Sequence, residues 1–179
     1  ALEQFRKERA AAAKALAEQE KPPEPVELGE VPEGAVRVAA VQFYPVFAGP
    51  ELNRERMVPY IRRAAKEGAK VIVFPEAAVP GYAEMNEEVC WIAGESDSDE
   101  YVDVTPHAEP ADGPSVEFFR PLVREFGIYL TVPIIEVENK RYFSTVLLLA
   151  PDGGIALKYR KRQLIPDYDG KWATIGDLG

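Results

Sequence analysis

The stretch Gly68-Ala-Lys-Val-Ile-Val-Phe-Pro-Glu76 decides the fold. Within it, residues 70–74 have the apolar composition of a strand that is covered on both faces of a sheet, and a proline follows directly. The preceding residues 53–67 place their apolar side chains on one face of a helix, which a glycine ends. Another apolar run, over residues 35–43, comes before that helix and has the few charges expected of a strand that is covered on both faces. This strand–helix–strand order predicts an α/β protein in which helices cover a sheet.

The chain after residue 114 continues this alternation. Residues 115–126 show helical periodicity and stop at a glycine, and an apolar strand is expected over residues 128–135. Residues 142–150 and 155–160 flank a Pro-Asp-Gly-Gly turn, and this pattern predicts a β-hairpin.

Three other segments have no pattern of a core element. Residues 1–20 form a charged helix with a thin apolar stripe, which predicts a docking arm or, less simply, a helix that recognises a specific partner. Residues 21–34 contain four prolines and four glutamates and predict an extended linker, so we place a boundary between units 1–34 and 35–179. Residues 83–113 carry ten Asp or Glu side chains and predict a long acidic loop, either a lid or an oligomer contact.

Composition excludes several classes of function. The formal net charge is −9, which disfavours binding to nucleic acid and to anionic lipid, because both require a basic surface. A single cysteine and a single histidine exclude an intrachain disulfide and a zinc site built from these residue types. No apolar run is long enough for a membrane span, and no secretory signal opens the sequence. We therefore expect a cytoplasmic protein with no metal and no organic cofactor.

Three charged residues at predicted strand ends are candidates for chemistry. Glu76 ends the strand over residues 70–74, at the sheet edge where ligands of α/β proteins collect, and partial withdrawal from water would suit it to a general base. Lys161 ends the hairpin and could stabilise a developing oxyanion. Glu136 follows the strand over residues 128–135. Each has a simpler interpretation, namely a solvated loop carboxylate, a charged strand end and a turn-flanking glutamate.

Taken together and in order, the motifs resemble the nitrilase, or carbon–nitrogen hydrolase, superfamily. The elements are Arg37-Val-Ala-Ala-Val-Gln42, the Phe-Pro-Glu that ends at Glu76, Pro80-Gly-Tyr82, Ala150-Pro-Asp-Gly153 and Lys158-Tyr-Arg-Lys161. The resemblance extends from about residue 36 to residue 165. It implies an αββα sandwich, of which this chain holds a part, and pairing of sandwiches into a homodimer or larger homo-oligomer.

The resemblance also implies a Glu-Lys-Cys catalytic set that acts on a small-molecule amide or nitrile. Glu76 matches the general base and Lys161 the oxyanion-stabilising lysine. Glu136 looks like the second glutamate that these enzymes often place near the nucleophile and the lysine. Such a set hydrolyses a non-peptide C–N bond through a thioester, and we expect an amide or carbamoyl substrate before a nitrile.

Two departures from the family pattern affect this expectation. The family's cysteine follows the lysine by a few tens of residues, whereas Cys90 precedes Lys161 and is interpreted as a loop or half-buried thiol without a catalytic role. We therefore expect the nucleophile beyond Gly179, with the 179 residues forming the N-terminal part of a longer protein. Ser144 also stands where relatives often carry Asn, which leaves the substrate side of the site open.

Two alternatives to a hydrolase remain. One is a non-catalytic scaffold or oligomerisation protein that kept the fold and lost the nucleophile. The other keeps the chemistry but transfers the acyl group to an amine instead of water.

Overall fold

The computed structural model describes residues 27–82, 90–94, 96–98 and 100–177, together with Lys7, Ala11 and Ala15. Apart from those three positions, the helix expected over residues 1–20 lies outside the described residues. Residues 27–34 belong to the expected linker; they are exposed and form neither helix nor strand. None of the helices in the described ranges has the length and the apolar character that crossing a bilayer requires.

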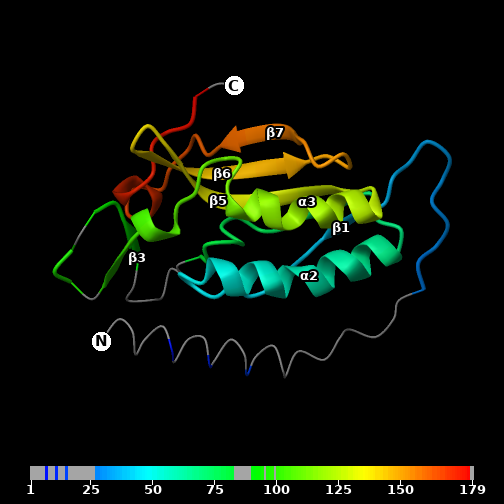
Figure 1. Cartoon of the computed structure of the whole chain (residues 1–179), viewed down its shortest axis with the longest axis horizontal. Helices are drawn as coiled ribbons and strands as arrows, with labels where there is room; N and C mark the ends of the chain where they lie inside the picture. Colours follow the sequence, from blue (N-terminus) through cyan, green and yellow to red (C-terminus); the bar gives the residue numbers. More distant parts are fainter. Residues whose placement is uncertain are drawn as a thin grey trace.

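A five-stranded sheet forms the centre of the molecule (Figure 1). Its strands, in spatial order, are β1 (Val38–Ala40), β2 (Val71–Val73), β5 (Tyr129–Glu138), β6 (Arg141–Leu149) and β7 (Ile155–Arg160). The first three strands are parallel, and the β5–β6 and β6–β7 pairs are antiparallel. The predicted α/β class and the predicted hairpin are both confirmed.

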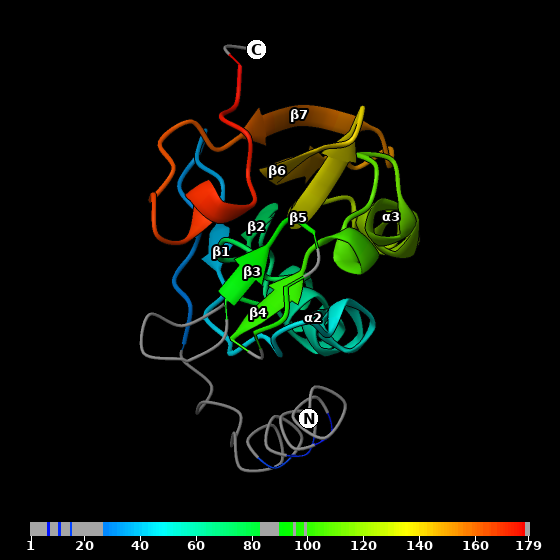
Figure 2. The ribbon, with the colours of Figure 1, turned by 90° about the vertical axis from the view of Figure 1, so that its left-hand side faces the viewer.

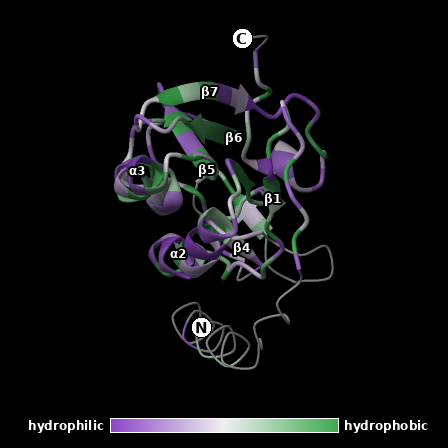
Figure 3. Ribbon diagram, turned by 90° about the vertical axis from the view of Figure 1, so that its right-hand side faces the viewer, coloured by the Kyte–Doolittle hydropathy of each residue, from purple (hydrophilic) through white to green (hydrophobic). Residues whose placement is uncertain are grey.

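Two helices, α2 (Pro50–Lys66) and α3 (Pro114–Phe126), cover one face of this sheet (Figure 2). Each begins with a proline, whose missing N–H costs nothing in the first turn of a helix. Helix α2 therefore starts three residues before the predicted position, and it continues through Pro59. The helices carry polar residues on their outer sides, whereas β5 and β6 are largely apolar (Figure 3). Met57, Ile61 and Phe119 are fully buried in the core between the two layers.

The other face of the sheet is open along much of its length. Side chains on this face remain exposed, at 55% for Val38 on β1 and at 53% and 50% for Leu157 and Tyr159 on β7. The sequence predicted strands that are covered on both faces, and in the described residues this prediction is wrong for β1. One helical layer on one sheet is half of an αββα sandwich, in agreement with the partial fold that was expected.

The acidic segment 83–113 contains more structure than the predicted loop. Strands β3 (Cys90–Ile92) and β4 (Tyr101–Asp103) form a parallel two-stranded sheet, and the 3-10 helix η1 (Thr105–His107) follows. Trp91 and Val102 on these strands pack with Ile135 of β5 in a second core. Strand β3 contains no acidic residue and β4 only Asp103, and both strands have three residues, too few to show a periodic pattern in the sequence.

Asn53 fastens the loops at the carboxyl end of the parallel strands. This side chain is fully buried on α2. Its Oδ1 accepts a hydrogen bond from the Val46 N–H at 2.7 Å, and its Nδ2 donates to the carbonyl oxygens of Val46 and Val79 at 2.7 and 2.9 Å. Gly81, at φ 90°, packs directly on the backbone of Val46. These contacts hold the segment that carries Glu76 against the helical layer.

Candidate active site

Glu76 lies in a tight turn just beyond β2. Pro75 ends the strand, and Ala77 adopts a positive φ of 54°, so the chain reverses at this point. The turn is fastened to β5, because the Phe74 N–H donates to Thr131 Oγ1 at 2.8 Å and the Val79 N–H donates to the Pro133 carbonyl at 3.2 Å. The Glu76 side chain remains 39% exposed, so it is more open to water than we expected.

Lys161 directly follows β7, and its side chain contacts Glu76. Its backbone N–H donates to the Ser144 carbonyl at 2.8 Å, which continues the β6–β7 pairing by one residue. Its Nζ lies 2.9 Å from Glu76 Oε1 and 2.7 Å from Asp169 Oδ2. The predicted convergence of an acid and an ammonium from two strand ends is therefore confirmed as geometry.

Two carboxylates set the charge state of Lys161. Burial alone would lower the pKa of its amine, but the hydrogen bonds from Nζ to Asp169 and Glu76 outweigh burial and raise the pKa above its ordinary value. The lysine is therefore fixed as an ammonium, with two of its three N–H bonds directed at carboxylates.

Ser144 completes the hydrogen bonds around Glu76. Its hydroxyl, on β6, donates to Glu76 Oε1 at 3.0 Å, the same oxygen that contacts Lys161. Glu76 Oε1 therefore accepts two hydrogen bonds from side chains, which orient the carboxyl group.

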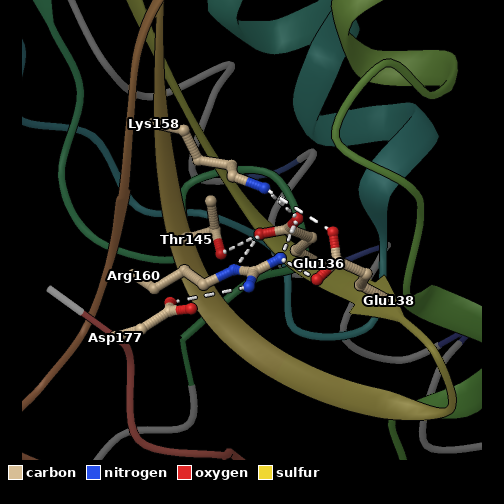
Figure 4. Close-up of polar contacts among 6 residues, drawn as sticks. All are labelled: Glu136, Glu138, Thr145, Lys158, Arg160 and Asp177. Carbon is tan, nitrogen blue, oxygen red and sulfur yellow. Dashed lines mark hydrogen bonds and ion pairs between the residues drawn. The ribbon is translucent and has the colours of Figure 1, made fainter. Parts of the chain in front are cut away.

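Glu136 lies on the opposite face of the sheet. Strand β5 runs to Glu138, so Glu136 is inside the strand rather than after it, and it shares the helix-covered face with Ile134. Its carboxylate is 1% exposed and bonds Thr145, Lys158 and Arg160 (Figure 4). The structure does not bring Glu136 to the Glu76–Lys161 pair.

Asp169 takes the position at Lys161 that we expected for a second carboxylate. It opens the 3-10 helix η2 (Asp169–Lys171), is buried, and also accepts a hydrogen bond from the Ile165 N–H at 3.1 Å. Sequence reasoning missed it because residues 162–168, which lead to it, form an irregular loop with no periodic pattern. The sequence contained one signal that could have found Asp169: it is an acidic residue soon after Lys161, with aromatic residues at positions 168 and 172 on either side.

A small cavity adjoins the Glu76 carboxylate. Ring side chains supply much of its wall, together with Ile134 and Ile135; the rings are Tyr82, Trp91, Tyr168 and Trp172. Trp91 is fixed there because its indole N–H donates to the Gly81 carbonyl at 3.2 Å. Burial and the nearby Glu76 charge raise the pKa of Tyr82, so this phenol stays protonated. The cavity therefore offers a largely aromatic and apolar wall beside two carboxylates, Glu76 and Asp169.

Cys90 lines the same cavity. It is a free thiol at the start of β3 and is half-buried, which is one of the two placements that we considered from the sequence. In the described parts of the chain, no three His, Cys, Asp or Glu side chains are grouped so that they could hold a metal ion.

Known proteins match this chain over the region that builds the site. Residues 37–175 match the family model described as "Carbon-nitrogen hydrolase". An aliphatic nitrilase of Sinorhizobium fredii is 36% identical over 128 residues, which cover 70% of this chain and 41% of that protein. A nitrilase of Pyrococcus abyssi is 30% identical over 146 residues, which cover 80% and 49%. The chain thus spans less than half the length of these curated relatives.

Solved structures support the same fold. A crystal structure of an N-terminal amidase with an Asn-Glu-Ala peptide superposes with a TM-score of 0.63 at 22% identity, over 79% of this chain and 31% of that one. An amidase from Nesterenkonia sp. gives 0.62 at 20% identity, over 84% and 52%. At such identities the likeness shows the fold alone, but the family model matches most of the sequence. The chain therefore belongs to the carbon-nitrogen hydrolase family.

Proposed function

We propose that the complete protein hydrolyses a non-peptide C–N bond through a thioester, with Glu76 as the general base and Lys161 as the oxyanion-stabilising cation. The observation that carries this proposal is the 2.9 Å contact between Glu76 Oε1 and Lys161 Nζ beside an apolar cavity. Membership in the family supports the reaction class. From the sequence we expected an amide or carbamoyl substrate first. Because relatives are named as nitrilases, a nitrile is proposed as a further possible substrate class.

The chemistry requires a sulfur nucleophile. Glu76 takes the thiol proton, and the thiolate attacks the carbonyl carbon while negative charge grows on the oxygen. Lys161 stabilises this charge because its ammonium is fixed beforehand. Glu76 then gives the proton to the leaving amine. Afterwards it takes a proton from the water that attacks the thioester carbon, and it passes this proton to the departing thiolate, so that the acid product and the free thiol are released.

We propose two supporting roles. Asp169, rather than Glu136, acts as the second carboxylate at Lys161: it keeps the amine protonated and directs it toward Glu76. Ser144 orients Glu76 through its hydroxyl. Both roles follow from the hydrogen bonds of these side chains, at 2.7 Å from Asp169 to Lys161 and 3.0 Å from Ser144 to Glu76.

The nucleophile is proposed to be a cysteine that follows Gly179, and Cys90 is the competing candidate because it lines the cavity. Cys90→Ser in the complete protein separates the two. We expect turnover to fall less than about fivefold, because a wall residue contributes little to bond-making; loss of a nucleophile instead costs several orders of magnitude. A collapse of turnover in Cys90→Ser would assign the chemistry to β3.

Glu76→Gln in the complete protein tests the role of the acid. The change preserves shape and removes the base, so we expect release of ammonia from a panel of small amides and nitriles to fall by about 10²–10⁴-fold. Glu125→Gln is the matched control, because Glu125 is also half exposed and pairs with a cation, Arg62, at 3.0 Å. Activity of Glu76→Gln equal to that of the control would remove the proposed base. Absence of turnover in the unmodified protein would favour the scaffold alternative.

A further inference from the structure

A buried charge cluster lies directly beneath the Lys161 end of β7. At its centre, the Arg160 guanidinium donates to both oxygens of Glu136, from Nη2 at 2.6 Å and from Nε at 2.9 Å (Figure 4). Lys158 Nζ and Thr145 Oγ1 donate to the same carboxylate at 3.0 and 2.8 Å. The Arg160 side chain is 6% exposed and lies over the Phe143 ring at 3.8 Å. A two-pronged contact of this kind fixes orientation as well as distance.

The cluster and the proposed active site use neighbouring residues of the same strands. On β6, Ser144 bonds Glu76 on one face, and Thr145 bonds Glu136 on the other. On the β7 side, Lys161 contacts Glu76 and Arg160 contacts Glu136. Successive side chains of a strand point to opposite faces, so fixing Arg160 below the sheet fixes the direction of Lys161 above it.

Arg160 also holds the segment that carries Asp169. Its Nη1 lies 3.7 Å from Asp177 Oδ1. Gly176 packs on the Arg160 backbone so closely that an added Cβ would lie 2.7 Å from Arg160 Cβ, and its N–H donates to the Lys161 carbonyl at 3.0 Å. Arg160 therefore anchors both the strand end that carries Lys161 and the segment that carries Asp169.

We propose that the Glu136–Arg160 pair is a positioning device that aims Lys161 at Glu76 and at the reacting oxygen. The inference rests on the proposed function and assigns neither Glu136 nor Arg160 a contact with substrate. A buried pair with this many donors is stiff, because moving either partner leaves a charge without its hydrogen bonds in a dry environment. A displacement of about 1 Å at a catalytic group is enough to lower turnover by roughly 10²-fold.

The test uses the complete protein and the double variant Glu136→Gln/Arg160→Gln. This change removes both charges together, so neither is left buried without a partner. Reactivity of Lys161 toward acetic anhydride at pH 9, measured peptide by peptide with mass spectrometry, reports directly on its ion pairs. We expect acetylation of Lys161 to rise about tenfold, because weaker ion pairs to Asp169 and Glu76 lower its raised pKa and free more of the amine, while acetylation of exposed Lys66 stays constant.

Arg62→Gln/Glu125→Gln is the matched control, since it removes an Arg–Glu pair of 3.0 Å from the surface between α2 and α3. We expect no change in Lys161 reactivity in this control. Unchanged Lys161 reactivity in the folded Glu136/Arg160 double variant would overturn the proposal. If the double variant does not fold, Glu136→Asp replaces it, because the shorter side chain keeps the charge but withdraws it from the two-pronged contact with Arg160. A rise in Lys161 acetylation then supports the proposal, and unchanged acetylation overturns it.

Kinetics give a second measure. In the double variant we expect kcat to fall about 100-fold while KM stays within about twofold of the wild-type value. The reason is that the Glu136–Arg160 pair acts on transition-state geometry rather than on substrate binding. Lys161 acetylation does not depend on turnover. A wild-type protein without activity therefore defeats the proposed function, whereas the acetylation result still decides the positioning role.

Discussion

Asn53→Asp tests how the loops beneath the site are held. The fully buried amide accepts one hydrogen bond and donates two. A carboxylate in its place would face two carbonyl oxygens. The protonated acid can still donate to the Val79 carbonyl, while the Val46 carbonyl keeps the Gly49 N–H at 3.2 Å, so the loss at low pH is about 1 kcal/mol.

The larger cost of Asn53→Asp comes from ionisation. The folded-state pKa of the new acid would lie far above its unfolded value of about 3.9, so the folded state binds more protons and stability falls as pH rises. Each pH unit between the two values costs about 1.4 kcal/mol. The deficit against wild type should therefore grow by about 3 kcal/mol from pH 5 to pH 7.

Urea unfolding of the complete protein at the two pH values measures this difference. Asn139→Asp is the control, because Asn139 is exposed in the β5–β6 turn, and its change should stay within about 0.5 kcal/mol at both pH values. A deficit for Asn53→Asp that is equal at pH 5 and pH 7 would refute the burial and hydrogen bonding that we describe.

Two further predictions concern stability. Gly81→Ala would push a Cβ into the Val46 carbonyl and to 2.5 Å from Phe47 Cα, at a φ of 90°. We therefore expect the free energy of unfolding in urea to fall by about 3 kcal/mol or more. The control is Gly34→Ala, for which we expect a loss of about 1 kcal/mol, because Gly34 has a φ of 77° but no atom within 4 Å of the added Cβ. Burial would raise the pKa of Glu136, but hydrogen bonds from Arg160, Lys158 and Thr145 lower it from 4.5 to about 2. Because the folded-state pKa is the lower one, the pair contributes about 3 kcal/mol above pH 4.5, and this is lost as pH falls toward 2. A Glu136→Gln variant whose stability falls as steeply as wild type over that range would contradict this assignment.

Local sequence patterns predicted the sheet and the two strand ends at which Glu76 and Lys161 meet. Uncharged β-branched runs gave β2 and β5, and the Pro-Asp-Gly-Gly turn gave the β6–β7 hairpin. The parallel and antiparallel order then brings Glu76 and Lys161 to one edge. This much follows from short-range sequence rules, because each rule acts on residues that are neighbours along the chain.

The positions of Glu136 and Asp169 depend on contacts that no local rule contains. Strand β5 continues through Glu136 because β6 pairs with it up to Glu138, and that extension decides which face the carboxylate occupies. Asp169 reaches Lys161 through an irregular loop, whose path is set by long-range hydrogen bonds such as that from the Thr174 N–H to the Tyr142 carbonyl at 2.7 Å. In both cases the partner, not the residue's own neighbours, determines the position.

Consecutive cations at residues 160 and 161 have a consequence for the register of β7. Because Arg162 follows them, a slip by one residue in one direction would place Lys161 at Glu136 and Arg162 at Glu76, and each acid would still meet a positive charge. Coulomb attraction alone therefore cannot distinguish the working alignment from the shifted one. The discrimination must come from the tight turn at 151–154, the irregularity between Leu148 and Leu149, and the flat guanidinium, which fits its two-pronged acceptor where an amine would not. A loop of altered length at that turn would thus yield a folded, charge-balanced and inactive molecule.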